Sequence, residues 1–145
     1  MPYWRLFYHI TWSTKNRMLW IDPAWEASLH NVIAAKATAL RGMVHAVGGI
    51  EDHVHLVASV PPSIALSEFI GQVKGNSSHF VNHEIKPDYH FAWQGQYGVV
   101  SFGGKQLDMV VKYVKNQREH HTGGTAITFL ETDEGSTLSG EKPPD

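Results

Sequence analysis

Two histidines flank Val54 in the segment HVHLVASV, which is rich in β-branched and aliphatic residues. Alternate side chains of a strand share a face, so His53 and His55 would point the same way, about 7 Å apart. Two imidazoles at that spacing can converge on one cation. Ten histidines in 145 residues make such a motif expected about once by chance. Two half-exposed strand histidines are therefore the alternative interpretation.

Tyr113 and Gln117 are four residues apart in a segment with helical periodicity, so they would share one helix face. A polarised phenolate is a competent nucleophile. The amide oxygen of a glutamine can join the ligands of a hard cation. The alternative is a boundary tyrosine that packs its ring beside a solvated glutamine.

Other histidines have simpler interpretations. His79 and His83 have the i,i+4 spacing of a helical metal site, but no third ligand and no completed zinc-protease motif accompany them. We expect them to be solvated. His120 and His121 would close the third helix, where an imidazolium suits the negative end of the helix dipole.

A third group of residues could hold nucleic acid. Cationic and amide side chains suit phosphates, and aromatic rings stack on unpaired bases. Core packing for the aromatic rings and a solvated surface for the cations are the alternatives. The candidates are Lys15, Asn16 and Arg17 in the first loop, Lys74, Asn76, Ser77 and Ser78 on the second helix, and Trp93, Tyr97 and Phe102 in and after an aromatic connection.

The pattern of residues along the chain predicts secondary structure in the order β-α-β-β-α-β-α. Hydrophobic alternation predicts strands, and 3.6-residue periodicity predicts helices. Asp22 and Ser63 are the predicted N-caps of the first two helices, and Gly42 is the predicted end of the first. The predicted strands cover residues 3–12, 43–50, 53–60 and 99–102, and the predicted helices cover residues 23–41, 64–85 and 105–120.

The first six elements match the split βαβ arrangement of ferredoxin-like folds. We therefore expect an α+β protein: an antiparallel sheet with two helices on one face and the other face free, plus a C-terminal helix that carries Tyr113. Val54, Leu56 and Ala58 would point into the core. The fold by itself names no function.

Composition and charge narrow the alternatives. The chain has no cysteine, which excludes disulfides, thiol catalysis and cysteine-ligated zinc. It has no apolar run long enough to span a bilayer and no signal-peptide pattern at its start, so we expect a cytoplasmic protein. Residues 1–120 hold 11 Lys and Arg against 9 Asp and Glu, whereas residues 121–145 hold 1 against 5. We expect one domain over residues 1–121 and an acidic, flexible tail over residues 122–145.

Taken together, these segments resemble the HUH superfamily of single-strand nucleases, named for a His-hydrophobe-His motif. The resemblance is to the single-tyrosine transposases of small bacterial insertion sequences and to their domesticated relatives of the REP-associated type. It covers most of residues 3–121. It rests on YHITWSTKNR at 8–17, GGIEDHVHLVASVPP at 48–62, FIGQVKGNSSHFVNHE at 69–84, FAWQGQYGVVSF at 91–102 and YVKNQREHH at 113–121.

The resemblance implies roles for particular residues. His53, His55 and Gln117 would ligate one Mg²⁺ or Mn²⁺, and Tyr113 would attack a phosphate of single-stranded DNA to give a 5′-phosphotyrosine and a free 3′-OH. The substrate would be a DNA strand with a hairpin near each end of the insertion element. Transposases of this kind act as homodimers, often with the tyrosine helix of one subunit completing the partner's histidine pair, so we expect a homodimer of this type. Some domesticated relatives act as monomers, and the sequence leaves open which chain supplies the tyrosine. Lys15, Arg17, Lys74, Asn76, Ser78 and Trp93 would contact the DNA.

Alternatives remain open at this level. Two imidazoles and an amide also accept Zn²⁺, Co²⁺ or Ni²⁺. A ferredoxin-like sheet with exposed aromatic residues could bind single strands without turnover. A small metal-dependent hydrolase would cleave with water and form no protein–DNA adduct. A domesticated nuclease would keep the chemistry without mobility. The mildly basic body predicts modest, salt-dependent DNA affinity.

Overall fold

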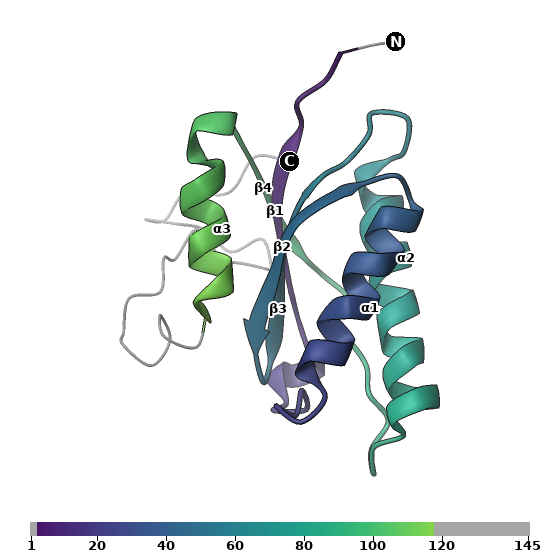
Figure 1. The fold of residues 1–145 in the computed structure, drawn as a ribbon. Coiled ribbons are helices and arrows are strands. Elements are labelled where there is room, and N and C mark those ends of the chain that lie inside the picture. Colours follow the sequence, from purple (N-terminus) through teal and green to yellow (C-terminus); the bar gives the residue numbers. More distant parts are fainter. Residues whose placement is uncertain (1–2, 118–145) are drawn as a thin grey trace.

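A four-stranded antiparallel sheet forms the centre of the protein in the computed structural model, which describes residues 3–117 (Figure 1). No helix in this range is both long and apolar enough to cross a membrane. The elements are the strands β1 (Phe7–Ser13), β2 (Met43–Ile50), β3 (His53–Ser59) and β4 (Gly98–Phe102), the helices α1 (Glu26–Ala39), α2 (Leu66–Phe80) and α3 (Leu107–Lys115), and the short helices η1 (Lys15–Arg17), η2 (Val81–Ile85) and η3 (Gly104–Gln106).

The strand order β2-β3-β1-β4 confirms the predicted split βαβ arrangement. Helix α1 connects β1 to β2 while β3 lies between those two strands, and helix α2 connects β3 to β4 across β1. All neighbouring strands are antiparallel. The order places β3, which carries the two motif histidines, beside β1 in the middle of the sheet.

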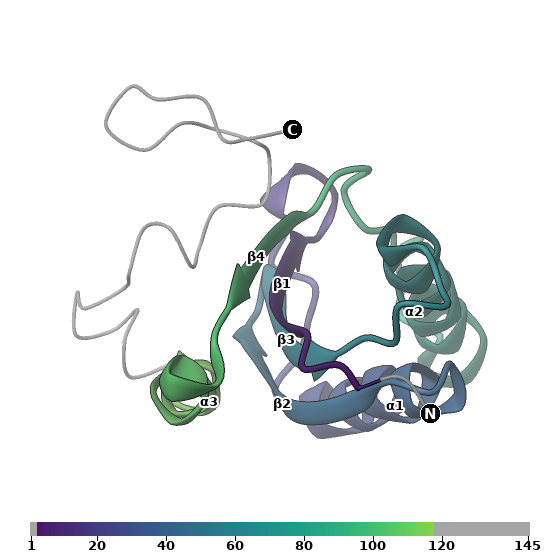
Figure 2. The same cartoon turned by 90° about the horizontal axis from the view of Figure 1, so that it is seen from above.

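Helices α1 and α2 cover one face of the sheet, as predicted (Figure 2). This face holds the main hydrophobic core because alternate residues of each central strand point toward the two helices. Val54, Leu56 and Ala58 of β3 are all fully buried here, which confirms their predicted inward direction. The core also contains Ile10 and Trp12 from β1, Leu29 and Ile33 from α1, and Phe69, Ile70 and Val73 from α2.

The opposite face is not free, contrary to the prediction. Helix α3 lies across it, on the side of the sheet away from α1 and α2 (Figure 2). Val110 and Val114 of α3 are buried against Ala46 of β2 and Val57 of β3 in a second hydrophobic cluster. The sequence of α3 has an apolar stripe at helical spacing, but this pattern alone does not show which surface the stripe covers.

The first two elements begin later than predicted. Strand β1 begins at Phe7 rather than Tyr3, because both of its neighbours pair with it only from Phe7 onward. Helix α1 begins at Glu26 because Asp22 caps a turn instead of the helix: its Oδ1 accepts a hydrogen bond from the Ala24 amide at 2.8 Å. The helix ends at Ala39, and the following backbone reverses at Arg41, which has a φ of 69°.

The other two helices also differ from their predicted bounds. Helix α2 begins at Leu66, and Ser63 does not cap it, because Ala65 occupies the N-cap position. After Phe80 the chain continues as the π-helical segment η2. Helix α3 follows η3 and ends at Lys115. The predicted end of this helix at residue 120, the cap at His120 and His121 and the tail over 122–145 lie outside the described residues.

Candidate active site

The two motif histidines lie on the face of β3 that α3 covers. His53 is 3% exposed and His55 is fully buried, so they are not half-exposed strand histidines. Their ring centroids are 4.9 Å apart and the rings are nearly perpendicular. Strand alternation fixes this shared face, because Val54 between them points into the opposite core. The structure thus brings the histidine pair together as predicted and also encloses it.

Asp52 fixes the ring of His53. The Nδ1 atom of His53 lies 2.7 Å from the Oδ1 atom of Asp52, and Arg17 lies 3.7 Å from the other carboxylate oxygen. Burial acts to raise the pKa of the Asp52 carboxyl, but the hydrogen bond with His53 and the charges of His53 and Arg17 outweigh it. The pKa of Asp52 therefore lies below its ordinary value. An ionised carboxylate accepts the Nδ1–H of His53, which directs Nε2 away from Asp52.

His9 and Thr11 of β1 contact the other histidine. The Nε2 atom of His9 lies 2.7 Å from the Nδ1 atom of His55, and the Oγ1 atom of Thr11 lies 3.2 Å from the same nitrogen. The antiparallel register places Thr11 directly opposite His55. Sequence reasoning missed His9 as a site residue. Alternation along β1 gives His9 and Thr11 the same face, but only the pairing of β1 with β3 places them beside His55.

The predicted tyrosine and glutamine reach the same place from α3. Tyr113 is 3% exposed, and its ring lies edge-on to His55 with centroids 6.2 Å apart. Gln117 follows two residues after the end of α3 and is 2% exposed. Its Oε1 atom lies 3.2 Å from Nε2 of His53, and its Nε2 atom donates to the carbonyl of Tyr113 at 3.3 Å. All four residues that the sequence analysis proposed for the chemistry therefore converge in one chain.

Gly48 permits α3 to approach the sheet this closely. A Cβ atom at residue 48 would lie 2.0 Å from the carbonyl oxygen of Val114, a separation that real Cβ atoms essentially never show. Gly48 is on the edge strand β2, directly opposite His55 in the register. The missing side chain therefore lets the end of α3 rest on the sheet beside the histidine pair. Gly49 then leads toward the β2–β3 turn with a φ of 151°.

The arrangement of donor atoms fits a divalent cation. Because Asp52 accepts the Nδ1–H of His53, the neutral form of His53 has its lone pair at Nε2, where it faces the Oε1 acceptor of Gln117. Two hydrogen-bond acceptors 3.2 Å apart repel each other unless a proton or a cation lies between them. Adjacent ligands of one octahedral Mg²⁺ are about 3 Å apart. No group of three or more His, Cys, Asp or Glu side chains in residues 3–117 could hold a metal, so an amide is the third candidate ligand.

The predicted DNA-contacting residues fall in two places. Lys15 and Arg17 belong to η1, and the chain just before η1 is bonded to the β2–β3 turn, since the Thr14 amide donates to the Asp52 carbonyl at 2.9 Å. Arg17 also pairs with Asp52. These two cations therefore lie at the His53 end of the candidate site. Lys74, Asn76 and Ser78 lie on α2, on the other face of the sheet.

Two of the candidates on the α2 side have structural partners. The Lys74 ammonium donates to the carbonyls of Gln94 and Gln96 at 2.7 and 3.0 Å, and the Trp93 indole donates to the Lys74 carbonyl at 3.1 Å. Trp93 is half-buried against Phe91, with ring centroids 4.7 Å apart. Lys74, Ser78 and Trp93 nevertheless line one cavity of about 430 Å³, together with His79, His83 and His90.

The exposed histidines of α2 and η2 do not form a second candidate metal centre. The rings of His79 and His83 stack with centroids 3.9 Å apart and an interplanar angle of 25°. Both residues are exposed, which agrees with their interpretation as solvated helix histidines. Parallel stacking directs the ring edges side by side rather than toward one shared ion. The chemistry is therefore concentrated on the α3 side of the sheet.

A split βαβ sheet with a buried His-hydrophobe-His pair against a Tyr-x-x-x-Gln segment defines a protein of the HUH superfamily. Within that superfamily, the sequence profile of the family described as "Transposase IS200 like" matches residues 2–117. The chain therefore belongs to the IS200-like transposase family, as the sequence resemblance predicted.

Individual relatives agree with this assignment. The transposases for insertion sequence element IS200 of Salmonella typhimurium and Salmonella typhi are each 30% identical to the chain over 97 residues, covering 63% of this chain and 61% of each relative. The match thus spans less than two thirds of the length of these relatives.

Two solved structures share the fold. A Deinococcus radiodurans R1 protein provisionally assigned as a transposase aligns with a TM-score of 0.62 at 23% identity, over 81% of this chain and 95% of that chain. A REP-associated tyrosine transposase bound to a REP hairpin aligns with a TM-score of 0.60 at 15% identity, over 87% and 76% of the two chains. At these identities the likeness concerns the fold alone.

Proposed function

We propose that this protein is a transposase that cleaves and rejoins single-stranded DNA through a phosphotyrosine intermediate. One observation carries the proposal: Tyr113 and Gln117 lie against His55 and His53 in a single buried site between α3 and the sheet. Membership of the IS200-like transposase family supports the same reaction class. The four residues combine a nucleophile with a set of cation ligands. Metal-assisted phosphoryl transfer to a protein side chain requires both.

The proposed step exchanges one phosphoester for another. The Tyr113 oxygen attacks the phosphorus of a DNA phosphodiester and loses its proton, and a bond forms between that oxygen and phosphorus. The bond from phosphorus to the 3′ oxygen breaks, and the departing oxygen takes up a proton to become a free 3′-OH. The 5′ side stays attached to Tyr113. Attack by a 3′-OH on this phosphotyrosine reverses the step and joins strands without ATP, because the ester linkage is conserved.

His53, His55 and Gln117 would hold the cation, which is Mg²⁺ or Mn²⁺ in our proposal. A bound divalent cation would neutralise phosphate charge and orient the scissile group. The protein itself supplies the fixed ring of His53 through Asp52 and the fixed amide of Gln117 through the Tyr113 carbonyl. The buried position of these groups excludes bulk water, which favours attack by tyrosine over hydrolysis.

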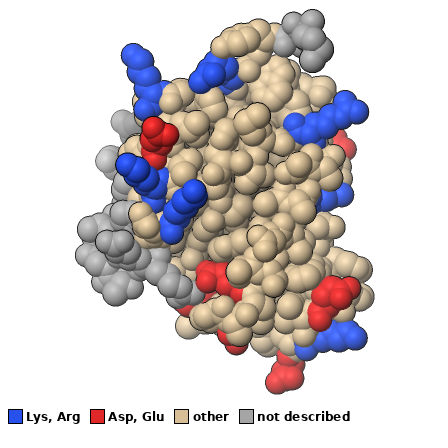
Figure 3. Space-filling model, viewed as in Figure 1, with Lys and Arg blue, Asp and Glu red and all other residues tan. Residues whose placement is uncertain are grey.

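Single-stranded DNA with a hairpin is the proposed substrate. Lys and Arg side chains gather over the α3 side of the molecule, with an acidic side chain among them (Figure 3). Lys105, Lys112 and Lys115 are exposed on or beside α3, so they can meet phosphates next to Tyr113. Sequence reasoning missed these three lysines, although their spacing on the polar side of the helix was visible. The structural neighbour bound to a REP hairpin is consistent with a hairpin ligand.

The test is covalent capture of DNA. We expect a labelled library of single-stranded hairpins, incubated with Mg²⁺ or Mn²⁺, to give a protein–DNA band on a denaturing gel. Tyr113→Phe should abolish this band while leaving the melting temperature and DNA binding close to those of the wild type, because only the attacking oxygen is removed. Tyr8→Phe is the matched control, since Tyr8 lies on β1 and packs against the opposite, main core.

Other outcomes would contradict the proposal in distinct ways. An adduct that persists in Tyr113→Phe would mean that the nucleophile is another residue. Cleavage without any adduct would indicate a nuclease that uses water. DNA binding that neither EDTA nor His55→Ala affects, with no cleavage across the library, would indicate a binding module without turnover.

The subunit arrangement forms a second part of the proposal. The resemblance predicted a homodimer, often with α3 exchanged between subunits, and left open which chain supplies the tyrosine. In the single chain Tyr113 contacts His55 of its own chain. We propose that the site functions within one chain, because α3 packs on its own sheet through Val110 and Val114. Mixing His55→Ala with Tyr113→Phe should then give no adduct. An adduct from the mixture would show exchange, because such a site would combine intact residues from both chains.

A further inference from the structure

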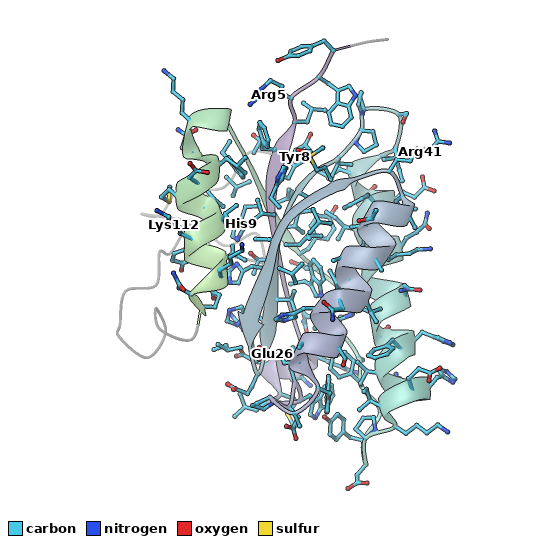
Figure 4. All side chains as sticks on the ribbon, in the orientation of Figure 1. Arg5, Tyr8, His9, Glu26, Arg41 and Lys112 are labelled. Atoms are coloured by element: carbon cyan, nitrogen blue, oxygen red, sulfur yellow. The ribbon has the colours of Figure 1, made fainter. Side chains whose placement is uncertain are left out.

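His9 is a buried histidine that the proposed reaction does not use. It is 1% exposed and lies on β1, between the sheet and α3 (Figure 4). Its Nε2 atom lies 2.7 Å from Nδ1 of His55, and the two rings stack with centroids 4.9 Å apart and an interplanar angle of 15°. The contact is short, buried and specific to one nitrogen of a proposed cation ligand.

The contact restricts where the proton of His55 can lie. One of the two facing nitrogens must donate and the other must accept. If His9 donates, neutral His55 carries its proton on Nε2, and that nitrogen has no lone pair for a cation. If His55 donates from Nδ1, its Nε2 atom keeps a lone pair. Thr11, whose Oγ1 atom lies 3.2 Å from the same Nδ1, can accept part of this hydrogen bond.

We propose that His9 is a positioning residue that accepts the Nδ1–H of His55 and so presents the Nε2 lone pair of His55 to the cation. This inference rests on the proposed function, in which His55 is a ligand. For His9 to accept at Nε2, its own proton must lie on Nδ1. The stacked rings also fix the plane of His55. Partners of this kind orient metal-ligating histidines and commonly change metal affinity 10- to 100-fold when removed.

The two ligand histidines are then held by acceptors of different chemistry. His53 donates its Nδ1–H to the carboxylate of Asp52, whereas His55 donates to the neutral imidazole of His9. The carboxylate lies 21% exposed beside Arg17, while His9 is enclosed in the sheet. A neutral acceptor can be buried at this depth without the desolvation cost of a charge. The difference in burial therefore explains why a carboxylate is the partner of His53 and a neutral imidazole is the partner of His55.

Two substitutions separate this role from simple packing. His9→Phe keeps a flat ring that can stack on His55 but removes the acceptor. His9→Gln loses the ring but offers an amide oxygen at about the reach of the imidazole Nε2. If His9 only filled space, phenylalanine would be the better replacement. If His9 positions His55, glutamine would be.

The experiment measures Mn²⁺ affinity of the full chain without DNA, by electron paramagnetic resonance of the free ion. We expect His9→Phe to weaken Mn²⁺ binding by about 10-fold or more, and His9→Gln to recover most of the loss. Wild-type affinity in His9→Phe would overturn the proposal. His55→Ala is measured in parallel: if it leaves Mn²⁺ affinity unchanged, the proposed metal site itself is wrong. If His55→Ala abolishes Mn²⁺ binding but His9→Phe does not weaken it, the metal site is correct and only the proposed role of His9 is wrong.

A spectroscopic measurement on the wild type keeps the inference testable even if His9→Phe does not fold. The ¹⁵N shifts of a neutral imidazole distinguish the two tautomers. We expect His55 in the metal-free chain to carry its proton on Nδ1 and His9 to carry its proton on Nδ1 as well. A His55 ring protonated on Nε2 would overturn the proposal, because its Nε2 could not then ligate a cation.

Discussion

The surroundings of the ring nitrogens determine what the histidines in residues 3–117 can do. These histidines share one side-chain chemistry but have several environments. His53 and His55 are buried and oriented by neighbours, whereas His79 and His83 are exposed and stack on each other. An exposed pair shares its edges with water, so it is not held in one ligand geometry. Function at this scale follows from the partners of a residue rather than from its type.

His45 provides a pH-dependent prediction away from the candidate site. This histidine is half-buried on β2, beside Phe7 and 2.8 Å from the Ser59 hydroxyl, and burial lowers its pKa in the folded state. The unfolded chain then binds the proton more readily than the folded one, so the stabilisation is present above about pH 6.5 and is lost as pH falls below that value.

We expect the free energy of unfolding in urea to fall between about pH 7.5 and about pH 5, and to fall less in His45→Gln than in the wild type. Glutamine keeps a group that can hydrogen-bond to Ser59 but does not titrate. Equal losses in the two proteins would show that His45 does not contribute to the acid dependence.

At the scale of secondary-structure elements, the position of α3 on the sheet matters most for the candidate site. The helix has only nine residues, so it depends on packing to stay in place. Its apolar side meets Ala46 and Val57, and its end rests on the backbone of Gly48. Since Tyr113 and Gln117 come from this region, the position of α3 sets the geometry of the whole site.

Gly48→Ala tests this close approach. The new methyl group would meet the Val114 carbonyl at 2.0 Å, so α3 must move away from the sheet. We expect a loss of stability of about 1–3 kcal/mol by urea unfolding, which is typical of overpacking, together with loss of the covalent DNA adduct. Gly71→Ala on α2 is the matched control, because nothing lies within 4 Å of the place that its new methyl group would occupy. That change should stabilise the helix by about 0.5–1 kcal/mol. Equal stability of the two variants would refute the role of Gly48.

Uneven charge is the feature that matters for the whole molecule. The chain carries a formal net charge of −2, yet residues 1–120 carry +2 and residues 121–145 carry −4. Exposed lysines lie on the α3 side, next to the candidate site. The acidic residues after 121 lie outside the described part of the chain, and the division into a domain over 1–121 and a tail over 122–145 stays a prediction. The negative charge of the acidic residues after 121 opposes DNA binding at long range, because DNA is also negatively charged.

Neutralising part of the acidic segment should therefore strengthen DNA binding. The triple variant Glu131→Gln, Asp133→Asn and Glu134→Gln changes the net charge from −2 to +1. We expect tighter binding of single-stranded hairpin DNA at low salt, measured by fluorescence anisotropy, and convergence with the wild type at high salt, where charges are screened. An affinity gain that does not shrink with salt would mean that the substitutions act through something other than charge.

The sequence alone determined the order of elements, the faces of β3 and the identity of the four candidate residues. These are local properties: alternation of side chains gives His53 and His55 one face, and helical spacing puts Tyr113 and Gln117 on one side. Element ends were less well predicted, because strand pairing starts β1 only at Phe7 and a turn captures Asp22.

The enclosure of these residues in one site depends on contacts between distant parts of the chain. Strand order places His9 and Thr11 against His55, although 46 and 44 residues separate them along the chain. The docking of α3 closes the face that periodicity alone left open, and it brings Gln117 to His53 across 64 residues. Such contacts depend on the register between distant strands and on a close approach at Gly48, and neither is encoded in the spacing of residues along one element.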